Sequence, residues 1–327
     1  MSRRGLMAAV AMVALVAMAC AAVLVMRAGR VPSAAPVPSD PSVPLLWKVS
    51  DGDNALYLLG SFHLLRESDY PLSAEVDAAF VDAETLLFEL SPEELESPEL
   101  GQQMLQAARW AEGRRLDDAL GPVLSARLQE WLGRNRQALG PAASEIQAYE
   151  PWFVAMLVSL TELGRHGLDP ALGLDRRLGQ RAIEAGKPVA GLETGAQQVA
   201  FLDGLAADDQ RQMLEEALDE AGDPSRIDAL HAAWRRGDVA VLQTEMGEGM
   251  RRDHPDLYRR INVERNLAWL PVLEARLGAA AGTDDTLVVV GALHLLGEDG
   301  LVEALRARGY AVERLCTACG KTAGLQR

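Results

Sequence analysis

The sequence predicts an α/β (α+β) protein with a mixed central β-sheet, strand-Gly-x-x-His-helix repeats at both ends of the chain, and long helical insertions capping the site. Three observations predict this class. Apolar runs followed by Gly-x-x-His occur at 56–63 and 287–294. Helical periodicity dominates 93–170 and 195–280, which lie between β-rich ends. With 327 residues and 49% hydrophobic content, the chain can bury a large core.

The elements expected in chain order follow from apolar periodicity and turn residues. They are a hairpin of strands 45–49 and 55–59, a helix from the N-cap Ser73 to 83, a strand at 85–90, helices over 93–165 divided by Gly-Pro at 121–122 and 140–141, a helix at 175–185, a strand at 189–193, helices over 195–280, a strand at 286–290, a helix at 299–308 and a strand at 310–315.

Residues 1–30 predict a targeting segment. Arg3 and Arg4 precede residues 6–26, a run of 21 residues without charge that is long enough to span a bilayer. Three fates are consistent with it: an uncleaved anchor, cleavage after Ala19, or a lipoprotein linked through Cys20. The charges before the run favour an N-terminus inside the cell. We therefore expect a periplasmic (extracytoplasmic) protein, anchored to the inner membrane or secreted, that contacts the membrane through this segment only.

The remaining chain divides into three parts. Residues 31–44 form a Pro/Ser-rich linker that we expect to be extended, residues 45–315 form the main domain, and residues 316–327 form a tail. The tail begins with a Cys-x-x-Cys motif, formed by Cys316 and Cys319. This motif predicts a local disulfide or two free thiols.

The charge distribution limits the partners. The formal net charge is −15, and the first 30 residues carry four arginines and no acid, which leaves −19 on the rest. A surface this acidic repels phosphate backbones, so no nucleic acid partner is expected. The substrate expected is a peptide or a small molecule, cationic or neutral.

The two Gly-x-x-His segments can be aligned residue by residue. A continuous apolar run suits a strand covered on both faces, and the glycine lets the chain leave the sheet tightly. His63 and His294 should therefore lie just beyond the carboxyl ends of strands, where open α/β sheets bind ligands. Glu89 and Glu193 lie at the carboxyl ends of two further strands. A carboxylate at the end of a buried strand requires a positively charged partner.

His63, His294 and Glu89 form a set of ligands that a divalent metal such as Mn, Co or Zn accepts. Three protein ligands would leave an open position for water, whose pKa the metal lowers. Each residue also has a plainer interpretation, as a hydrogen-bonded loop histidine or a solvated acid. The remaining histidines are expected to be surface or packing residues: His166, His231 and His254.

At these residues the chain resembles the TraB/GumN family, which is related to the Tiki metalloproteases and to erythromycin-esterase-like enzymes. The resemblance covers roughly 45–315. It rests on Leu-Leu-Gly-Ser-Phe-His at 58–63, Leu-Phe-Glu-Leu at 87–90, Gly-Leu-Asp at 173–175, Gly-Leu-Glu-Thr at 191–194, Arg-Asn at 265–266 and Val-Gly-Ala-Leu-His-Leu-Leu-Gly at 290–297.

The resemblance implies a metal-dependent, peptidase-like hydrolase. His63, His294 and Glu89 would bind the metal and catalyse, with Glu89 as a ligand or as the base for water, and Glu193 or Arg265 would orient substrate. The esterase branch implies a different enzyme, a metal-independent hydrolase with a histidine base. A non-catalytic envelope protein that binds a metal or another ligand is a third alternative.

Overall fold

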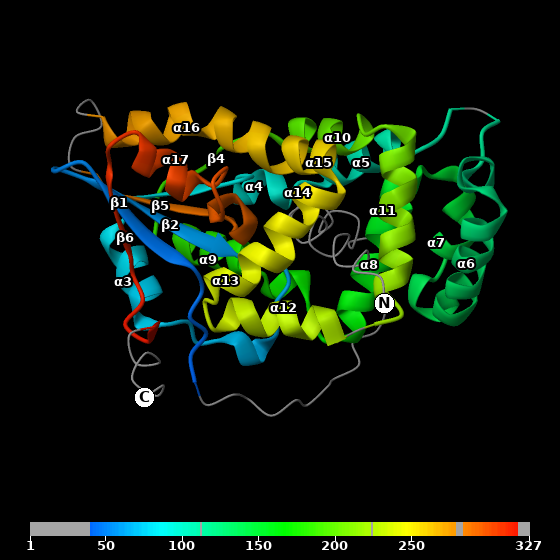
Figure 1. Ribbon diagram of the computed structural model, residues 1–327, viewed down its shortest axis with the longest axis horizontal. Helices are drawn as coiled ribbons and strands as arrows, with labels where there is room; N and C mark the ends of the chain where they lie inside the picture. Colours follow the sequence, from blue (N-terminus) through cyan, green and yellow to red (C-terminus); the bar gives the residue numbers. More distant parts are fainter. Residues whose placement is uncertain (1–39, 112, 224, 279–283, 320–327) are drawn as a thin grey trace.

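The computed structural model describes residues 40–111, 113–223, 225–278 and 284–319. The predicted targeting segment, most of the linker and the last residues of the tail lie outside these ranges. None of the helices within them is both long and apolar enough to cross a membrane. In Figure 1 the sheet occupies one half of the molecule and a group of helices the other.

Six strands form one mixed sheet in the order β4-β3-β5-β2-β1-β6. The strands are β1 Leu46–Ser50, β2 Ala55–Ser61, β3 Thr85–Phe88, β4 Val189–Gly191, β5 Thr286–Gly291 and β6 Ala311–Arg314. β4, β3, β5 and β2 run parallel, whereas β1 is antiparallel to both β2 and β6. Every residue of β2 and β5 is buried, as their unbroken apolar sequences require. The predicted fold class is confirmed.

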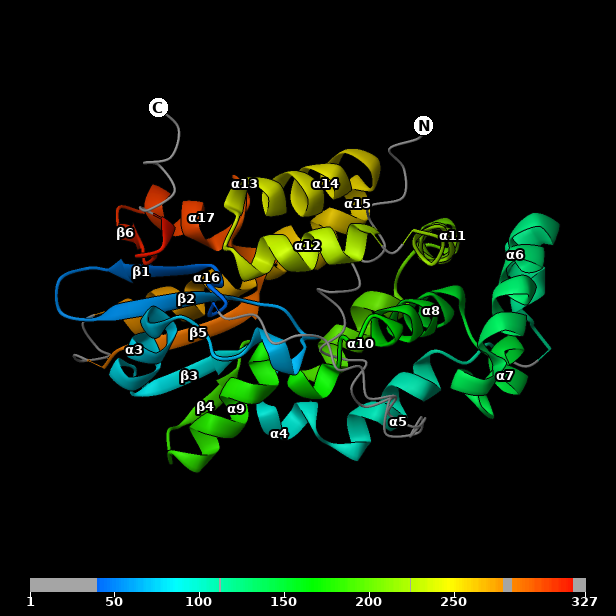
Figure 2. The same ribbon diagram turned by 90° about the horizontal axis from the view of Figure 1, so that it is seen from below.

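Helices cover both faces of this sheet. α3 (Ala74–Asp82) and α9 (Leu174–Glu184) lie on one face, and α16 (Glu264–Leu277) and α17 (Leu301–Ala307) lie on the other (Figures 1 and 2). This double cover accounts for the burial of the central strands.

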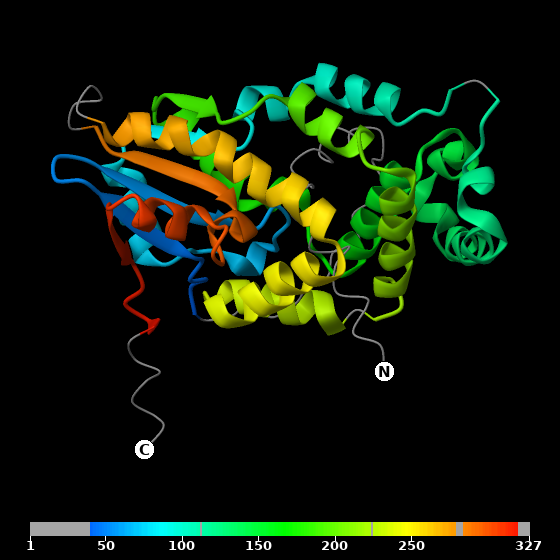
Figure 3. The same ribbon diagram turned by 45° about the horizontal axis from the view of Figure 1, so that its top comes forward.

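Most of the other helices lie beyond the carboxyl ends of the parallel strands, with α6 farthest from the sheet (Figure 3). The α-helices are α4 Pro92–Leu95, α5 Pro98–Ala107, α6 Leu116–Leu139, α7 Ala142–Glu145, α8 Pro151–Arg165, α10 Gly195–Asp203, α11 Ala207–Glu220, α12 Ser225–Arg235, α13 Val239–Leu242, α14 Gly249–Asp253 and α15 Pro255–Tyr258. Short 3-10 turns are η2 Glu67–Asp69, η3 Ile146–Ala148, η4 Pro170–Leu172 and η8 Ala292–Leu295, and π-helical turns are η5 Gln243–Glu248 and η6 Arg259–Val263.

The two Gly-Pro pairs break the helical region where the sequence predicts. Gly121 has φ 72° and ψ 169° and divides α6 into two helices. Gly140, with φ 54°, ends the second of them. Both backbone angles lie in the region that glycine reaches without a steric penalty, so the breaks follow directly from the residue type.

The structure shortens the predicted linker. The last residues of the expected extended linker are packed: Ser42 exchanges backbone hydrogen bonds with the segment around Pro71 and Ser73, and the Val43 N–H donates to the Arg235 carbonyl at 2.7 Å. Pro/Ser composition does not reveal such pairing because it depends on backbone groups supplied by distant segments. The linker therefore ends before Ser42.

Candidate functional site

The two Gly-x-x-His segments lie side by side. β2 and β5 are neighbours in the sheet, and Ser61 pairs with Gly291, so the aligned glycines are offset by one residue in register. His63 is the second residue after β2, and His294 lies in the 3-10 turn after β5. Glu89 is the first residue after β3, on the other side of β5. Three adjacent strand ends thus bring together the histidine pair and the glutamate, which we call the strand-end cluster.

The strand-end cluster is closed to solvent. His294 is 0% exposed, His63 2%, and Glu89 and Arg265 3% each. Charged side chains are rarely buried this deeply unless they are paired. Each of them therefore needs partners, and those partners define the chemistry of the cluster.

His63 presents one ring nitrogen to the centre of the cluster. Its Nδ1 lies 3.0 Å from Oδ1 of Asp175, an oxygen that also accepts a hydrogen bond from the Ser61 hydroxyl at 2.9 Å. Because a carboxylate only accepts, Nδ1 carries a proton. Burial opposes the charged form of the ring, but Asp175 and Glu89 outweigh it and raise the pKa of His63. Its buried Nε2 has no hydrogen-bond partner.

His294 is held in the same tautomer by different groups. Nη1 of Arg265 lies 3.1 Å from its Nε2, and because a guanidinium only donates, Nε2 must accept. Nδ1 therefore carries the proton and donates to Oδ1 of Asn266 at 2.7 Å. The Asn266 amide donates to the carbonyls of His294 and Asp299, which fixes its orientation. Burial and Arg265 together lower the pKa of His294 to about 3.

Glu89 lies between the two histidines. Its Oε1 accepts the Gly291 N–H at 2.6 Å and lies 3.9 Å from Nε2 of His63 and 3.8 Å from Nε2 of His294. Its Oε2 accepts from Arg265 at 2.5 Å. Burial acts to raise the pKa of Glu89, but Arg265 and the histidines outweigh it and lower the pKa to about 2. The carboxylate is therefore ionised at neutral pH.

Glycine at position 291 is required by this packing. A β-carbon there would lie 3.1 Å from Oε1 of Glu89 and 3.4 Å from Nε2 of His63. Without a side chain at this position, the backbone N–H reaches the carboxylate directly.

Arg265 is the positively charged partner of the buried carboxylates of Glu89 and Glu193. It reaches the cluster from the first turn of α16 and forms a two-point ion pair with Glu193, through Nε at 3.1 Å and through Nη2. Burial raises the pKa of Glu193, against the opposing effect of Arg265. The pKa of Arg265 is raised above its ordinary value because Glu89 and Glu193 outweigh its burial. The predicted positive partner of the strand-end acids is thus an arginine within the chain.

Two residues that orient the histidines of the cluster were missed by reasoning from the sequence. Asp175 orients His63, and Asn266 orients His294. Both lie in segments that carry the family resemblance, Gly-Leu-Asp and Arg-Asn, so the signal that could have found them was present. Their roles depend on which helix faces which strand, which periodicity does not reveal.

The donor atoms suit a divalent metal in type but not in spacing. Ligands of a tetrahedral metal with bonds of about 2.0–2.1 Å lie about 3.3–3.4 Å apart. The separations from Glu89 Oε1 to both imidazoles exceed this by about half an ångström. Arg265 also lies against one of the nitrogens. Within the described residues, no group of three His, Cys, Asp or Glu side chains could hold a metal as it stands.

The two histidines make hydrogen bonds of the kind that metal-binding histidines make. Histidines that bind metals usually donate their second N–H to a carboxylate or carbonyl oxygen, which fixes the free nitrogen towards the ion. His63 and His294 do so through Asp175 and Asn266. The orphaned Nε2 of His63 is a buried lone pair or proton without a partner, and such groups are uncommon in native structures. These residues would hold a divalent metal only in a different arrangement, with the donors closer together and Arg265 away from His294.

The other histidines have packing roles. His231 is buried and lies 2.8 Å from Asp69, and His254 is buried against Glu216 at 2.5 Å. His166 is partly exposed at the end of α8. None of the three contacts the strand-end cluster in the described structure, in agreement with the expectation from sequence.

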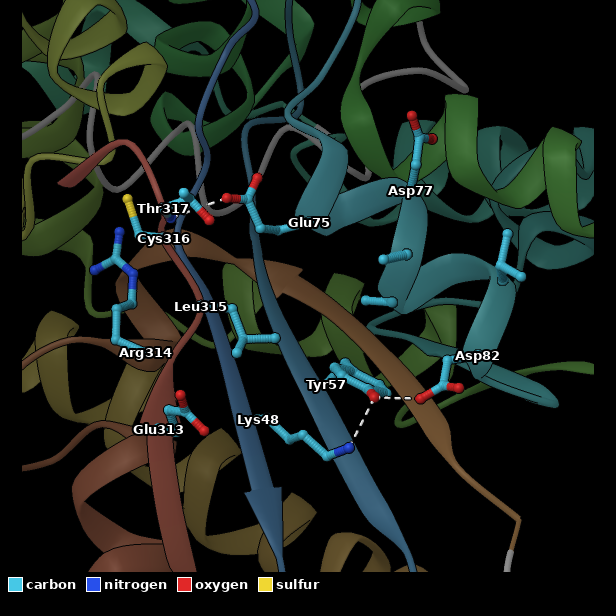
Figure 4. A pocket seen from close by; sticks show the side chains of 13 residues that line it. Lys48, Tyr57, Glu75, Asp77, Asp82, Glu313, Arg314, Leu315, Cys316 and Thr317 are labelled. Atoms are coloured by element: carbon cyan, nitrogen blue, oxygen red, sulfur yellow. Dashed lines mark hydrogen bonds between the residues drawn. The ribbon is translucent and has the colours of Figure 1, made fainter. Parts of the chain in front are cut away.

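A separate cavity lies between α3 and the strands β1, β2 and β6. It has a volume of about 840 Å³, and none of its lining residues belongs to the strand-end cluster. Figure 4 shows Lys48 donating to Tyr57, which in turn donates to Asp82. The chain after β6 forms one wall, where the Thr317 N–H donates to Glu75 at 2.9 Å. Cys316 and Cys319 form a disulfide there, the first of the two predicted alternatives.

The fold and the cluster define a class: an α/β protein with a buried histidine, glutamate and arginine centre at the ends of parallel strands. The sequence model of the TraB/PrgY/gumN family matches residues 45–314, and the chain belongs to that family. The uncharacterized protein YbaP of Escherichia coli (strain K12) is 26% identical over 261 residues, which cover 78% of this chain and 89% of YbaP. YbaP of Shigella flexneri matches over the same lengths with the same identity. No solved structure matches the chain.

Proposed function

We propose that this protein is a metal-dependent hydrolase whose site is the strand-end cluster, with His63, His294 and Glu89 as the metal ligands and peptides as the substrate class. The observation that carries the proposal is the pair of fixed tautomers: both imidazoles direct Nε2 towards Oε1 of Glu89. The choice of peptides rests on the family resemblance described above.

The charge of the buried groups supports a divalent cation. Asp175, Glu89 and Glu193 supply three carboxylates and Arg265 supplies one guanidinium, which leaves two negative charges when both histidines are neutral. Burying uncompensated charge is unfavourable. An ion of charge +2 balances this set, and Mn, Co and Zn all accept nitrogen and oxygen ligands.

The roles of the residues follow from their contacts. A metal bound here would supply Lewis-acid polarisation of the scissile carbonyl. Glu89, ionised and held by the Gly291 N–H, accepts a proton from an attacking water or ligates the metal. Asp175 and Asn266 hold the imidazoles in place. Arg265, paired with Glu193, is a positive group for a substrate carbonyl or carboxylate.

The test is metal analysis followed by activity screening of the full-length chain, kept in mild detergent because of its apolar N-terminal run. The chain is stripped with a chelator, reloaded with Mn, Co or Zn, and tested on peptide and ester libraries. We expect stoichiometric metal and turnover that falls about 100-fold or more in His294→Ala. His166→Ala, a histidine outside the cluster, should retain full activity. Bound metal without turnover of any substrate would indicate a binding protein.

A second candidate is a metal-independent hydrolase with His63 as the base. The arrangement of Asp175 on Nδ1 and an unpartnered Nε2 on the same ring favours it, because a carboxylate that orients an imidazole is a recurrent general-base device. The two candidates respond differently to chelation. Activity that survives exhaustive chelation and is lost in Asp175→Asn would select the metal-independent enzyme.

We place the activity outside the cytoplasm, also as a proposal. Arg3 and Arg4 before the apolar run support this orientation, and the Cys316–Cys319 disulfide suits an oxidising compartment. A C-terminal alkaline phosphatase fusion should be active, and a cytoplasmic reporter at the same position should be inactive. The reverse pattern would overturn the assignment.

A further inference from the structure

Helix α16 is apolar on its outer face as well as on its buried face. Its inner face contributes Trp269, Leu270 and Leu273 to the core. In Figure 1, α16 runs along one side of the molecule and no described element lies outside it. The exposed positions between Glu264 and Arg276 are nevertheless all apolar, and we call them the α16 apolar face: Leu267, Ala268, Pro271, Val272 and Ala275.

Such a face is unusual for a helix at the surface. Leu267 is 60% exposed and Val272 40% exposed. A surface helix normally presents polar residues to solvent, whereas a helix that is apolar all round is normally buried. Adjacent exposed apolar side chains on one element often mark a contact with another molecule. The α16 apolar face therefore lacks a cover in a single copy of the chain.

The two ends of this face carry opposite charges. Residues four apart lie on one row of a helix, so Glu264, Ala268, Val272 and Arg276 form a row along the exposed side. Glu264 is exposed and pairs with the exposed Arg259. The side chain of Arg276 is in no ion pair with the described residues. The row thus begins with a carboxylate and ends with a guanidinium that has no acidic partner.

This row is complementary to itself when a second copy runs in the opposite direction. A two-fold axis between Ala268 and Val272 places Glu264 opposite Arg276 of the second copy, and Ala268 opposite Val272. Opposite charges then meet at both ends, and a small side chain meets a larger one in the middle. Rows of residues four apart also pack against each other in the commonest class of helix pairs. Two-fold symmetry makes every such contact twice.

A membrane surface fits the same face less well. Anionic lipids attract Lys and Arg next to an apolar face. Here Glu264 lies at one end of the face and Glu274, paired with Arg308, borders it. The chain also carries a formal net charge of −15. The charges around α16 therefore favour a second copy of the chain over a lipid surface.

We propose that two copies of this chain form a two-fold dimer through the α16 apolar face, with α16 antiparallel to α16 of the second copy. The contact lies on the back of the helix that supplies Arg265 and Asn266 to the strand-end cluster. It does not depend on the reaction proposed for that cluster. One helix per copy is a small interface, so the dimer should dissociate at concentrations on the order of micromolar or higher.

The first test is sedimentation equilibrium of the full-length chain in a detergent whose density is matched to that of the solvent. We compare wild type with Val272→Glu and with Val123→Glu, which makes the same substitution at a 75% exposed valine on α6. Val272→Glu should raise the dissociation constant at least about tenfold, because two carboxylates would be buried without partners. Val123→Glu should match wild type.

Wild type that stays monomeric at every concentration overturns the proposal. A dimer that is unaffected by Val272→Glu overturns it as well, because the contact must then lie elsewhere, for example in the apolar run 6–26.

Charge exchange tests the antiparallel pairing. Glu264→Arg and Arg276→Glu each place like charges opposite one another at two symmetric sites, and each should weaken the dimer about fivefold. The double variant restores opposite charges and should return the dissociation constant to the wild-type value. Such recovery cannot arise from variants that fail to fold. A double variant as weak as the single variants overturns the antiparallel arrangement.

Thiol labelling identifies what covers the face. Val272→Cys is made in a Cys20→Ser background, where Cys316 and Cys319 are held in their disulfide. Its reaction with a maleimide should slow as the protein concentration rises, while that of Val123→Cys should stay constant. Slow labelling of Val272→Cys at every concentration would mean that detergent or the same chain covers the face. That result overturns the dimer contact.

Discussion

Asp175 controls both the orientation and the charge of His63, since it accepts the Nδ1 proton at 3.0 Å. Burial disfavours the charged ring, and Asp175 is the main group that raises the pKa of His63 in spite of it. In Asp175→Asn the opposing charge is gone, so burial should lower the pKa of His63 below 6.5. Histidine ring signals followed by NMR against pH measure this change. The His254 signals, which belong to a pair with Glu216, should not move.

Gly291→Ala tests the close packing at the end of β5. The added methyl group would lie 3.1 Å from Oε1 of Glu89 and must push the carboxylate away from the histidines. In the proposed reaction this displacement should lower kcat/KM by up to about 100-fold, and zinc affinity should fall as well. Gly133→Ala, a helical glycine with open space around its side-chain position, is the control and should change neither. Equal effects of the two variants would contradict the role of Gly291.

Glu89 should make the stability of the protein sensitive to acid. Its pKa is about 2 in the folded state against an ordinary value of 4.5, because Arg265 and the histidines overcome its burial. The carboxylate therefore adds stability above pH 4.5, and this contribution is lost as the pH falls through about 2. The free energy of unfolding should fall less steeply over that range in Glu89→Gln than in wild type. The exposed Glu99→Gln makes the same charge change and should follow wild type.

The positions of single site residues were predictable where the residue follows a strand. His63, His294 and Glu89 follow apolar runs, so the pattern places all three at strand ends, and the sheet order makes those ends adjacent. The expectation of a positive partner for the acids was also sound. The sequence did not predict that this partner is Arg265, because it does not show which side of α16 packs against the sheet.

At the scale of elements, the hairpin, the parallel strands and the Gly-Pro breaks follow from local pattern alone. β3 and β4 are shorter than expected, ending at Phe88 and Gly191, which leaves the glutamates as loop residues rather than strand residues. The sequence cannot resolve this because ladder hydrogen bonds, not composition, decide where a strand ends. The π-helical turn η6 just before Arg265 was likewise unexpected, and such turns are often found at functional sites.

The disulfide after β6 closes only a short loop, and the length of this loop sets the cost of breaking the bond. Cys316 and Cys319 close a loop of four residues, so in the chain-entropy estimate the bond adds at most about 2 kcal/mol. The double variant Cys316→Ser/Cys319→Ser should lower the free energy of unfolding by no more than that. Zinc affinity should not change, because the disulfide lines the separate cavity. A large loss in either quantity would show that this segment supports the cluster.

The molecule as a whole encloses its candidate site. His63 and His294 are essentially unexposed, whereas the side chain of His166 is 24% exposed. Brief treatment with diethyl pyrocarbonate should therefore modify His166 first, and the cluster histidines only at the rate at which the protein opens. Peptide mass spectrometry reports each site separately. Rapid modification of His294 would instead mean that the closed arrangement is short-lived.

The pairing of β2 with β5 has a consequence for how the protein is made. The two strands are neighbours in the sheet, yet one lies near the start of the chain and the other near its end. During synthesis β2 cannot pair with β5 until more than 200 further residues have left the ribosome. The strand-end cluster therefore cannot assemble until β5 and the turn that carries His294 have been synthesised.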